Sequence, residues 1–164
     1  GAGSVLDQLV KIEADYYCTN GAIPMADGGI AAVEGTPMDF RTFSPVGRAL
    51  RSDFVQLRQV GGFNHTYVLR KRERGALELA ASMYDPGSGR KMEVYTTMPG
   101  LHFFSANKTT PRTGKCGATY DRQFGLCFET QFFSNSAKCT WFPSPVLRKE
   151  NSYRQVTEFR FLVS

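Results

Sequence analysis

Histidine and tryptophan are scarce in this 164-residue chain, which holds two histidines and one tryptophan. Its four cysteines are widely spaced and form no C-x-x-C pair: Cys18, Cys116, Cys127 and Cys139. Zinc sites usually draw on cysteine and histidine at close spacing. The pattern therefore argues against a zinc site and predicts free thiols in a reducing compartment.

Long apolar runs, internal repeats and low-complexity tracts are missing too. Because a membrane-spanning helix needs about 20 apolar residues, we expect no membrane partner. The first four residues, Gly-Ala-Gly-Ser, lack the charged and apolar regions of a signal peptide. We interpret residues 1–4 as a cloning scar and residues 5–164 as part of one domain. A cytoplasmic location is the simplest expectation, and targeting by a segment upstream of residue 1 stays open.

The charge balance is mildly basic, with a net charge of +5 and a pI near 9.1. The densest basic run is Arg70–Arg74, between two apolar stretches. Such a run predicts a solvated loop, with contact to a nucleic acid or another macromolecule as the minor alternative. We predict no nucleic-acid partner.

What the chain has in plenty is aromatic residues and alternating patterns. Thirteen Phe and seven Tyr favour β-rich packing. Alternation of apolar and polar residues predicts strands over residues 10–15, 77–83, 92–97, 101–106, 126–132 and 153–163. One short helix is predicted over Pro45–Leu50, with Ser44 as its N-cap. The fold class is therefore all-β, an antiparallel β-sandwich whose loops and one sheet face carry the function.

One predicted strand carries a carboxylate among apolar neighbours. Alternation places Leu126 and Phe128 on one face and Cys127, Glu129 and Gln131 on the other. An ionised carboxylate is costly to remove from water unless it is paired, so a buried Glu129 would indicate a functional role and a better base. The alternative is that this face of the sheet is simply wet.

Six stretches, in order along the chain, resemble the galactose mutarotase (aldose 1-epimerase) family. They are Ala22–Pro24, Gly35–Arg41, Gly61–Leu69, Met92–Leu101, Gly125–Gln131 and Phe142–Arg148. Their order and spacing match the family's C-terminal half. The resemblance implies a large antiparallel β-sandwich, the mutarotase-like supersandwich, of which this chain covers about half.

The resemblance also implies an activity. Aldose 1-epimerases are isomerases of hexose metabolism that interconvert the α and β anomers of a free hexose such as galactose or glucose. A carboxylate removes the proton from the C1 hydroxyl while a histidine protonates the ring oxygen, with no cofactor. Glu129 matches the family's catalytic base. The acid histidine belongs to an upstream stretch absent from this sequence, so we expect this chain alone to be inactive.

The resemblance implies substrate-binding roles for Asn64, His102 and Phe103. Asn64 stands where the family has an aspartate, and His102 stands where it usually has a glutamine. Phe103 and Phe104 are candidates for an aromatic wall against the sugar, although one of them has to face the core. His65 is expected to be structural, with a loop hydrogen bond.

Three functional classes remain open at this stage. The first is an aldose 1-epimerase, and the second is a catalytically altered, mutarotase-like carbohydrate-binding protein, for which Asn64 and His102 are the evidence. The third is macromolecular binding by the basic loop. The expected ligand is a free monosaccharide. Because half a sandwich leaves open edges and apolar faces, we expect the missing N-terminal half or a second copy to cover the exposed sheet face.

Overall fold

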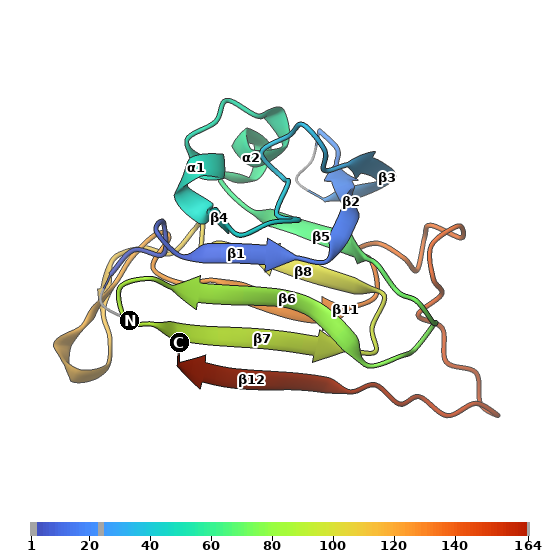
Figure 1. Ribbon diagram of the computed structural model, residues 1–164. Coiled ribbons are helices and arrows are strands. Elements are labelled where there is room, and N and C mark those ends of the chain that lie inside the picture. The colour runs from blue at the N-terminus through green and yellow to red at the C-terminus, as the bar shows by residue number, and fades with distance from the viewer. Residues whose placement is uncertain (1–2, 23–24, 164) are drawn as a thin grey trace.

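Two five-stranded antiparallel sheets form most of the computed structural model, which describes residues 3–22 and 25–163 (Figure 1). Residues 1–2 of the expected cloning scar lie outside the described residues, as do Ile23 and Pro24 of the first family-like stretch. The predicted all-β antiparallel class is confirmed.

The first sheet, here called sheet A, contains a hairpin formed by the strands predicted over residues 77–83 and 92–97. Its strand order is β12 (Thr157–Val163), β7 (Arg90–Thr96), β6 (Glu78–Asp85), β1 (Leu9–Ile12) and β4 (Ser44–Pro45). All of its pairings are antiparallel. The last strand closes the chain along the edge of this sheet, beside β7 (Figure 1).

The second sheet, here called sheet B, carries the family-like stretches around Asn64, His102 and Glu129. Its order is β11 (Cys127–Gln131), β8 (Gly100–Phe104), β5 (Asn64–Leu69), β2 (Ala14–Asn20) and β3 (Ala26–Ala32). A two-stranded ribbon of β9 (Arg112–Thr113) and β10 (Thr119–Tyr120) flanks a 3-10 turn at Lys115–Gly117.

The core lies between the two sheets and is rich in aromatic rings. Phe103 of β8 is its centre: its ring lies 4.8 Å from that of Phe63 and 5.2 Å from that of Phe128, measured between ring centroids. Val10 and Val94 of sheet A join the same cluster with no exposed surface. Burial of each such side chain stabilises the fold by roughly 1.5–3 kcal/mol. This core fixes which face of sheet B points outward.

The helices differ from expectation in two ways. Helix α1 (Val46–Leu50) is the predicted one, but its N-cap is Pro45, because Ser44 is paired with Val10 in sheet A. Helix α2 (Val55–Val60) was not predicted. It buries only Leu57 and Val60, and one such pair is too little to produce a helical period in the sequence.

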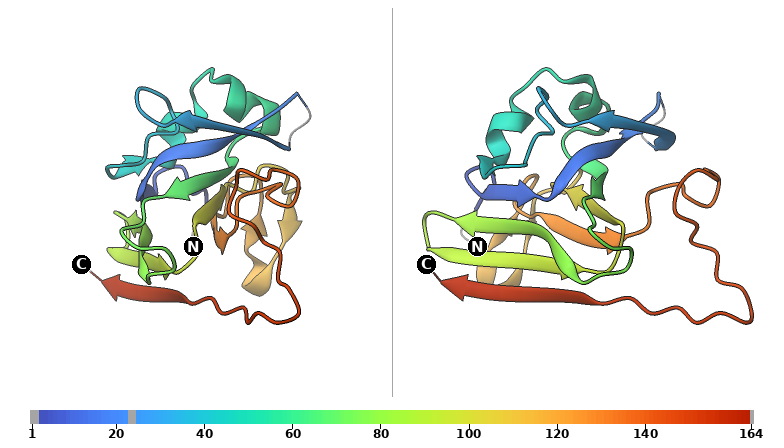
Figure 2. Two further views of the ribbon diagram at one scale, coloured as in Figure 1. Left: turned by 90° about the vertical axis from the view of Figure 1, so that its right-hand side faces the viewer. Right: turned by 45° about the vertical axis from the view of Figure 1, so that its right-hand side comes forward.

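The end of the chain leaves apolar surface open. After β11 the chain extends away from the body and then returns as β12 (Figure 2). β12 begins at Thr157, four residues later than predicted, because its partner β7 ends at Thr96. Phe161 and Val163 are 76% and 84% exposed. Among the described residues, no strand pairs with the outer edge of β12.

Two further findings concern the sequence-level expectations. All four cysteines are free thiols, as predicted: Cys18 and Cys139 are buried, and Cys116 and Cys127 are exposed. No helix in residues 3–22 and 25–163 is long and apolar enough to cross a membrane.

Candidate active site

Three side chains of the candidate site stand in one row on the outer face of sheet B. Strand pairing places His102 of β8 opposite Glu129 of β11 on one side and opposite Thr66 of β5 on the other. Directly opposed residues of antiparallel strands have Cβ atoms about 5 Å apart. Their neighbours Phe128, Phe103 and Tyr67 point the other way, into the core. The predicted alternation along β8 and β11 is confirmed.

A small cavity opens at the Thr66 end of this row, with a volume of about 180 Å³. Five of its eight lining residues are polar, and the lining comes from β2, the start of β3 with the residue before it, β5, β8 and the loop after β11. The lining residues are Cys18, Asn20, Met25, Ala26, Asn64, Thr66, His102 and Ser134. Asn64 and His102, both predicted as sugar contacts, are therefore brought together. Glu129 stands beside His102, next to this cavity rather than in its lining.

A hydrogen-bond chain organises the cavity wall. The His102 Nε2 atom lies 3.1 Å from Asn64 Oδ1, and its Nδ1 atom lies 3.0 Å from Thr66 Oγ1. Thr66 Oγ1 in turn lies 2.8 Å from the hydroxyl of Ser134. Sequence reasoning missed Thr66 and Ser134. Alternation in β5 would have placed Thr66 on the face of Asn64, but no pattern links it to Ser134, 68 residues away.

Burial sets the protonation of both histidines. Desolvation lowers the pKa of His102, with the nearby Glu129 carboxylate opposing this shift. His65 is 1% exposed and points into the core, where desolvation lowers its pKa to about 3. Its Nδ1 accepts a hydrogen bond from the Asn64 backbone N–H at 3.2 Å. The expected structural role of His65 agrees with this position.

Comparison with known proteins decides the family. A family model described as aldose 1-epimerase matches residues 1–160. The chain belongs to the aldose 1-epimerase family. Galactose mutarotases of pig and cattle are 33% and 34% identical to it over 165 and 167 residues, covering 100% of this chain and 46% of theirs. The aldose 1-epimerase of Escherichia coli is 30% identical, over 96% of this chain and 46% of its own length.

Solved structures support the same fold. An aldose epimerase homologue from C. elegans aligns with a TM-score of 0.86 at 23% identity, over 99% of this chain and 48% of its own. Galactose 1-epimerase from Lactobacillus acidophilus aligns with a TM-score of 0.72 at 21% identity, over 98% and 45%. These likenesses confirm the predicted β-sandwich. This aldose 1-epimerase family member spans about half the length of the curated relatives it matches.

Phe103 requires a correction. It is fully buried, and its ring packs in the core against Phe63 and Phe128, so it offers no surface to a sugar. Side chains alternate between the two faces of a strand, so Phe103 lies on the inward face of β8 together with Leu101. Phe104 is the one on the outer face, opposite Asn64 in the strand register.

Of the two interpretations of the Glu129 strand, the buried carboxylate is not found in this chain. Glu129 is exposed, as is Cys127 two residues before it. β11 is the edge strand of sheet B, so only β8 flanks Glu129 within the sheet. In the described residues, the wet-face alternative holds.

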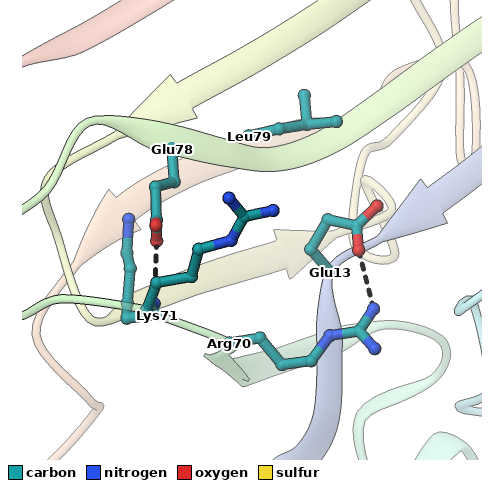
Figure 3. Close-up of a pocket in the computed structure, with 6 residues that line it drawn as sticks. Glu13, Arg70, Lys71, Glu78 and Leu79 are labelled. Atoms are coloured by element: carbon teal, nitrogen blue, oxygen red, sulfur yellow. Dashed lines mark hydrogen bonds and ion pairs between the residues drawn. The ribbon is translucent and has the colours of Figure 1, made fainter.

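The basic loop forms a second hollow, which Glu13, Arg70, Lys71 and Glu78 help to line and in which Arg70 faces Glu13 (Figure 3). Arg70 donates to the Glu13 carboxylate at 2.6 Å. Lys71 Nζ donates to the backbone carbonyls of Ala76 and Thr96. Two cations of the run are thus engaged within the chain, which leaves fewer to bind a polyanion.

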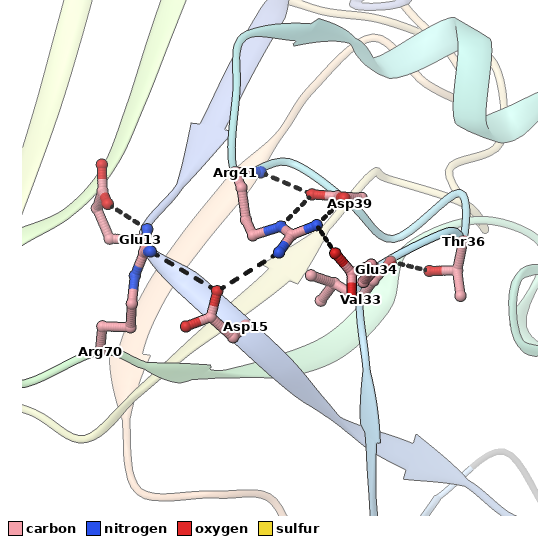
Figure 4. A network of polar contacts seen from close by, with 8 residues as sticks. All are labelled: Glu13, Asp15, Val33, Glu34, Thr36, Asp39, Arg41 and Arg70. Atoms are coloured by element: carbon pink, nitrogen blue, oxygen red, sulfur yellow. Dashed lines mark hydrogen bonds and ion pairs between the residues drawn. The ribbon is translucent and has the colours of Figure 1, made fainter.

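The neighbouring acidic residues form a network with Arg41 (Figure 4). Arg41 donates to both oxygens of Asp39, at 3.0 and 2.8 Å, and lies 3.4 Å from the carboxylate of Glu34. The carboxylate of Asp15 lies 3.6 Å from the guanidinium of Arg70. Asp39 and Arg41 therefore form an ion pair within the Gly35–Arg41 stretch. Exposed pairs of this kind contribute little stability each, so the network mainly orders the loop after β3.

Proposed function

We propose that this chain is the C-terminal half of an aldose 1-epimerase that interconverts the α and β anomers of a free hexose such as galactose or glucose. The observation that carries the proposal is the arrangement on sheet B. Glu129, which the resemblance identifies as the base, shares one sheet face with Asn64 and His102, and His102 is its direct cross-strand neighbour.

In this proposal Glu129 takes the proton from the C1 hydroxyl, and the electrons of that oxygen form the aldehyde as the C1–ring oxygen bond breaks. A protonated acid delivers a proton to the departing ring oxygen. Rotation about C1–C2 and closure on the other face reverse both transfers. Glu129 is then protonated when the ring opens and returns that proton when the ring closes.

In this proposal the acid lies outside this chain. Its two histidines are His65, which is buried in the core, and His102, whose two ring nitrogens are both engaged with Asn64 and Thr66. The family resemblance implies a histidine of the N-terminal half as the acid, and the isolated chain is expected to be inactive.

The same half accounts for the open surface. We propose that residues 5–164 complete a single sandwich domain with the N-terminal half, which covers the exposed face of β12 and closes over Glu129. Phe161 and Val163 would then lose most of their contact with water. A second copy of the chain is the alternative cover. Location in the cytoplasm stays a prediction.

A second candidate function is carbohydrate binding without rapid anomerisation. The observation that favours it is the Asn64–His102 hydrogen bond, since an uncharged amide replaces the family's aspartate at this position. Such a protein would still bind a monosaccharide in the same cavity.

Polarimetry of freshly dissolved α-D-galactose and α-D-glucose separates the candidates. Acceleration by the full-length protein, and none by the 164-residue chain, is the expected result. If the full-length protein binds these sugars without accelerating the change in rotation, the binding function replaces the epimerase.

A further inference from the structure

The proton positions in the His102 chain follow from the chemistry of its atoms. Asn64 Oδ1 is an acceptor only, so His102 Nε2, 3.1 Å away, has to carry the hydrogen. A neutral imidazole has one N–H, so Nδ1 bears a lone pair and Thr66 Oγ1, 3.0 Å away, donates to it. The Thr66 oxygen then accepts from Ser134 at 2.8 Å. Each donor in the chain meets one acceptor.

The site around His102 keeps the ring in this state. Thr66 is 1% exposed, so its hydroxyl has little access to water as an alternative partner. Burial lowers the pKa of His102, which keeps the ring neutral near pH 7. The backbone of Asn64 is also held, since its carbonyl accepts from Asn20 Nδ2 at 3.3 Å.

The orientation of the Asn64 amide is the consequence. Its oxygen is held by His102, so its NH₂ group is the part left for the cavity, and no hydrogen bond to it is found among the described residues. We propose that His102 is a positioning residue that fixes the Asn64 amide with its two N–H donors toward the ligand. The site then requires a sugar oxygen that accepts a hydrogen bond there, where an aspartate would require one that donates.

This inference rests on the proposed function only for its ligand, and its first test needs no activity. In long-range ¹H–¹⁵N spectra of the full-length protein at pH 7.5, comparison with His102→Gln assigns the imidazole signals of His102. We expect His102 as the neutral Nε2–H form. Thr66→Val, which keeps the shape but loses the hydroxyl, should shift the Nδ1 resonance, and Thr66→Ser should restore it. An Nδ1–H form or a charged ring overturns the proposal.

The second test uses the full-length protein and the change in KM. His102→Leu frees the Asn64 amide and is expected to raise KM about fivefold to tenfold, the effect of one lost hydrogen bond. His102→Gln still donates to Asn64 Oδ1 and should restore most of the affinity. In an Asn64→Ala background, His102→Leu should change KM less than about twofold, because the residue through which it acts is gone.

Failure of the proposed role of His102 can be distinguished from failure of the proposed function. Equal effects of His102→Leu on KM in both backgrounds would show that His102 does not act through Asn64. If the full-length protein does not anomerise sugars, the proposed function fails, and the ¹⁵N spectra together with sugar titration of the same variants still decide the role of His102.

Discussion

Lowering the pH from 7.5 to 5 is expected to remove about 2 kcal/mol of folding stability through one buried imidazole, that of His65. The ring lies in the core in a T-shaped contact with Tyr17, and its Nε2 atom has no hydrogen-bond partner among the described residues. Burial lowers its pKa from 6.5 to about 3 in the folded chain. A charged imidazole here would have neither solvent nor a counter-charge.

The sign follows from linkage. The folded pKa lies below the unfolded one, so the contribution of neutral His65 is fully present above pH 6.5 and is lost as the pH falls toward 3. At pH 5 the folded ring is still neutral and the unfolded ring is charged. The free energy of unfolding then falls by about 1.4 kcal/mol for each of the roughly 1.5 pH units between pH 6.5 and pH 5. A folded pKa one unit higher would hardly change this figure.

The assay is urea unfolding followed by circular dichroism at pH 7.5, 6 and 5, with His65→Phe as the control. Phenylalanine keeps an aromatic ring in the core but does not titrate, so its loss of stability over this range should be smaller by about 2 kcal/mol. Titrating groups that do not interact with His65 affect both proteins alike. Identical pH dependence in the two proteins would refute the reasoning. If the variant does not fold, a His65 signal in wild-type NMR that is charged at pH 5 has the same meaning.

Three further predictions concern packing. Phe103→Ala should cost about 3–5 kcal/mol in urea unfolding because it empties the core centre, whereas Phe104→Ala on the outer face should cost much less; comparable losses would contradict the assigned faces. Gly100→Ala should lower the free energy of unfolding by about 1–3 kcal/mol, because the added Cβ would lie 2.9 Å from the Phe133 ring and 3.0 Å from Thr66 Cγ2. Unchanged stability would disprove this tight fit. The isolated chain should self-associate in light scattering, and Phe161→Asp should reduce this; a monodisperse 18.3 kDa monomer would argue against a covered β12 face.

Much of sheet B could be predicted because alternation is a local property of the chain. Alternation of successive side chains predicted that Glu129 and Phe128 lie on opposite faces of their strand, and the structure agrees. The same rule, applied to Leu101, would have excluded Phe103 from the cleft. The segments that cover a sheet face come from elsewhere in the chain. The exposure of Glu129 therefore could not be predicted from the sequence of its own strand.

The candidate site was predicted only in part for the same reason. The resemblance identified Asn64 and His102 one by one. Their mutual hydrogen bond depends on the register of β5 against β8, and the contact of Thr66 with Ser134 depends on a loop without periodicity. Helix α2 was missed because six residues with two buried positions leave no helical signal.

The central claim is that Glu129 is the base of an aldose 1-epimerase. Its most direct test is polarimetry of α-D-galactose with the full-length protein and with its Glu129→Gln variant, at equal concentration and with circular dichroism as the check on folding. Because glutamine keeps the shape but cannot accept the proton, the rate should fall about 100-fold or more while the spectrum stays unchanged. Equal rates for the two folded proteins would contradict the account.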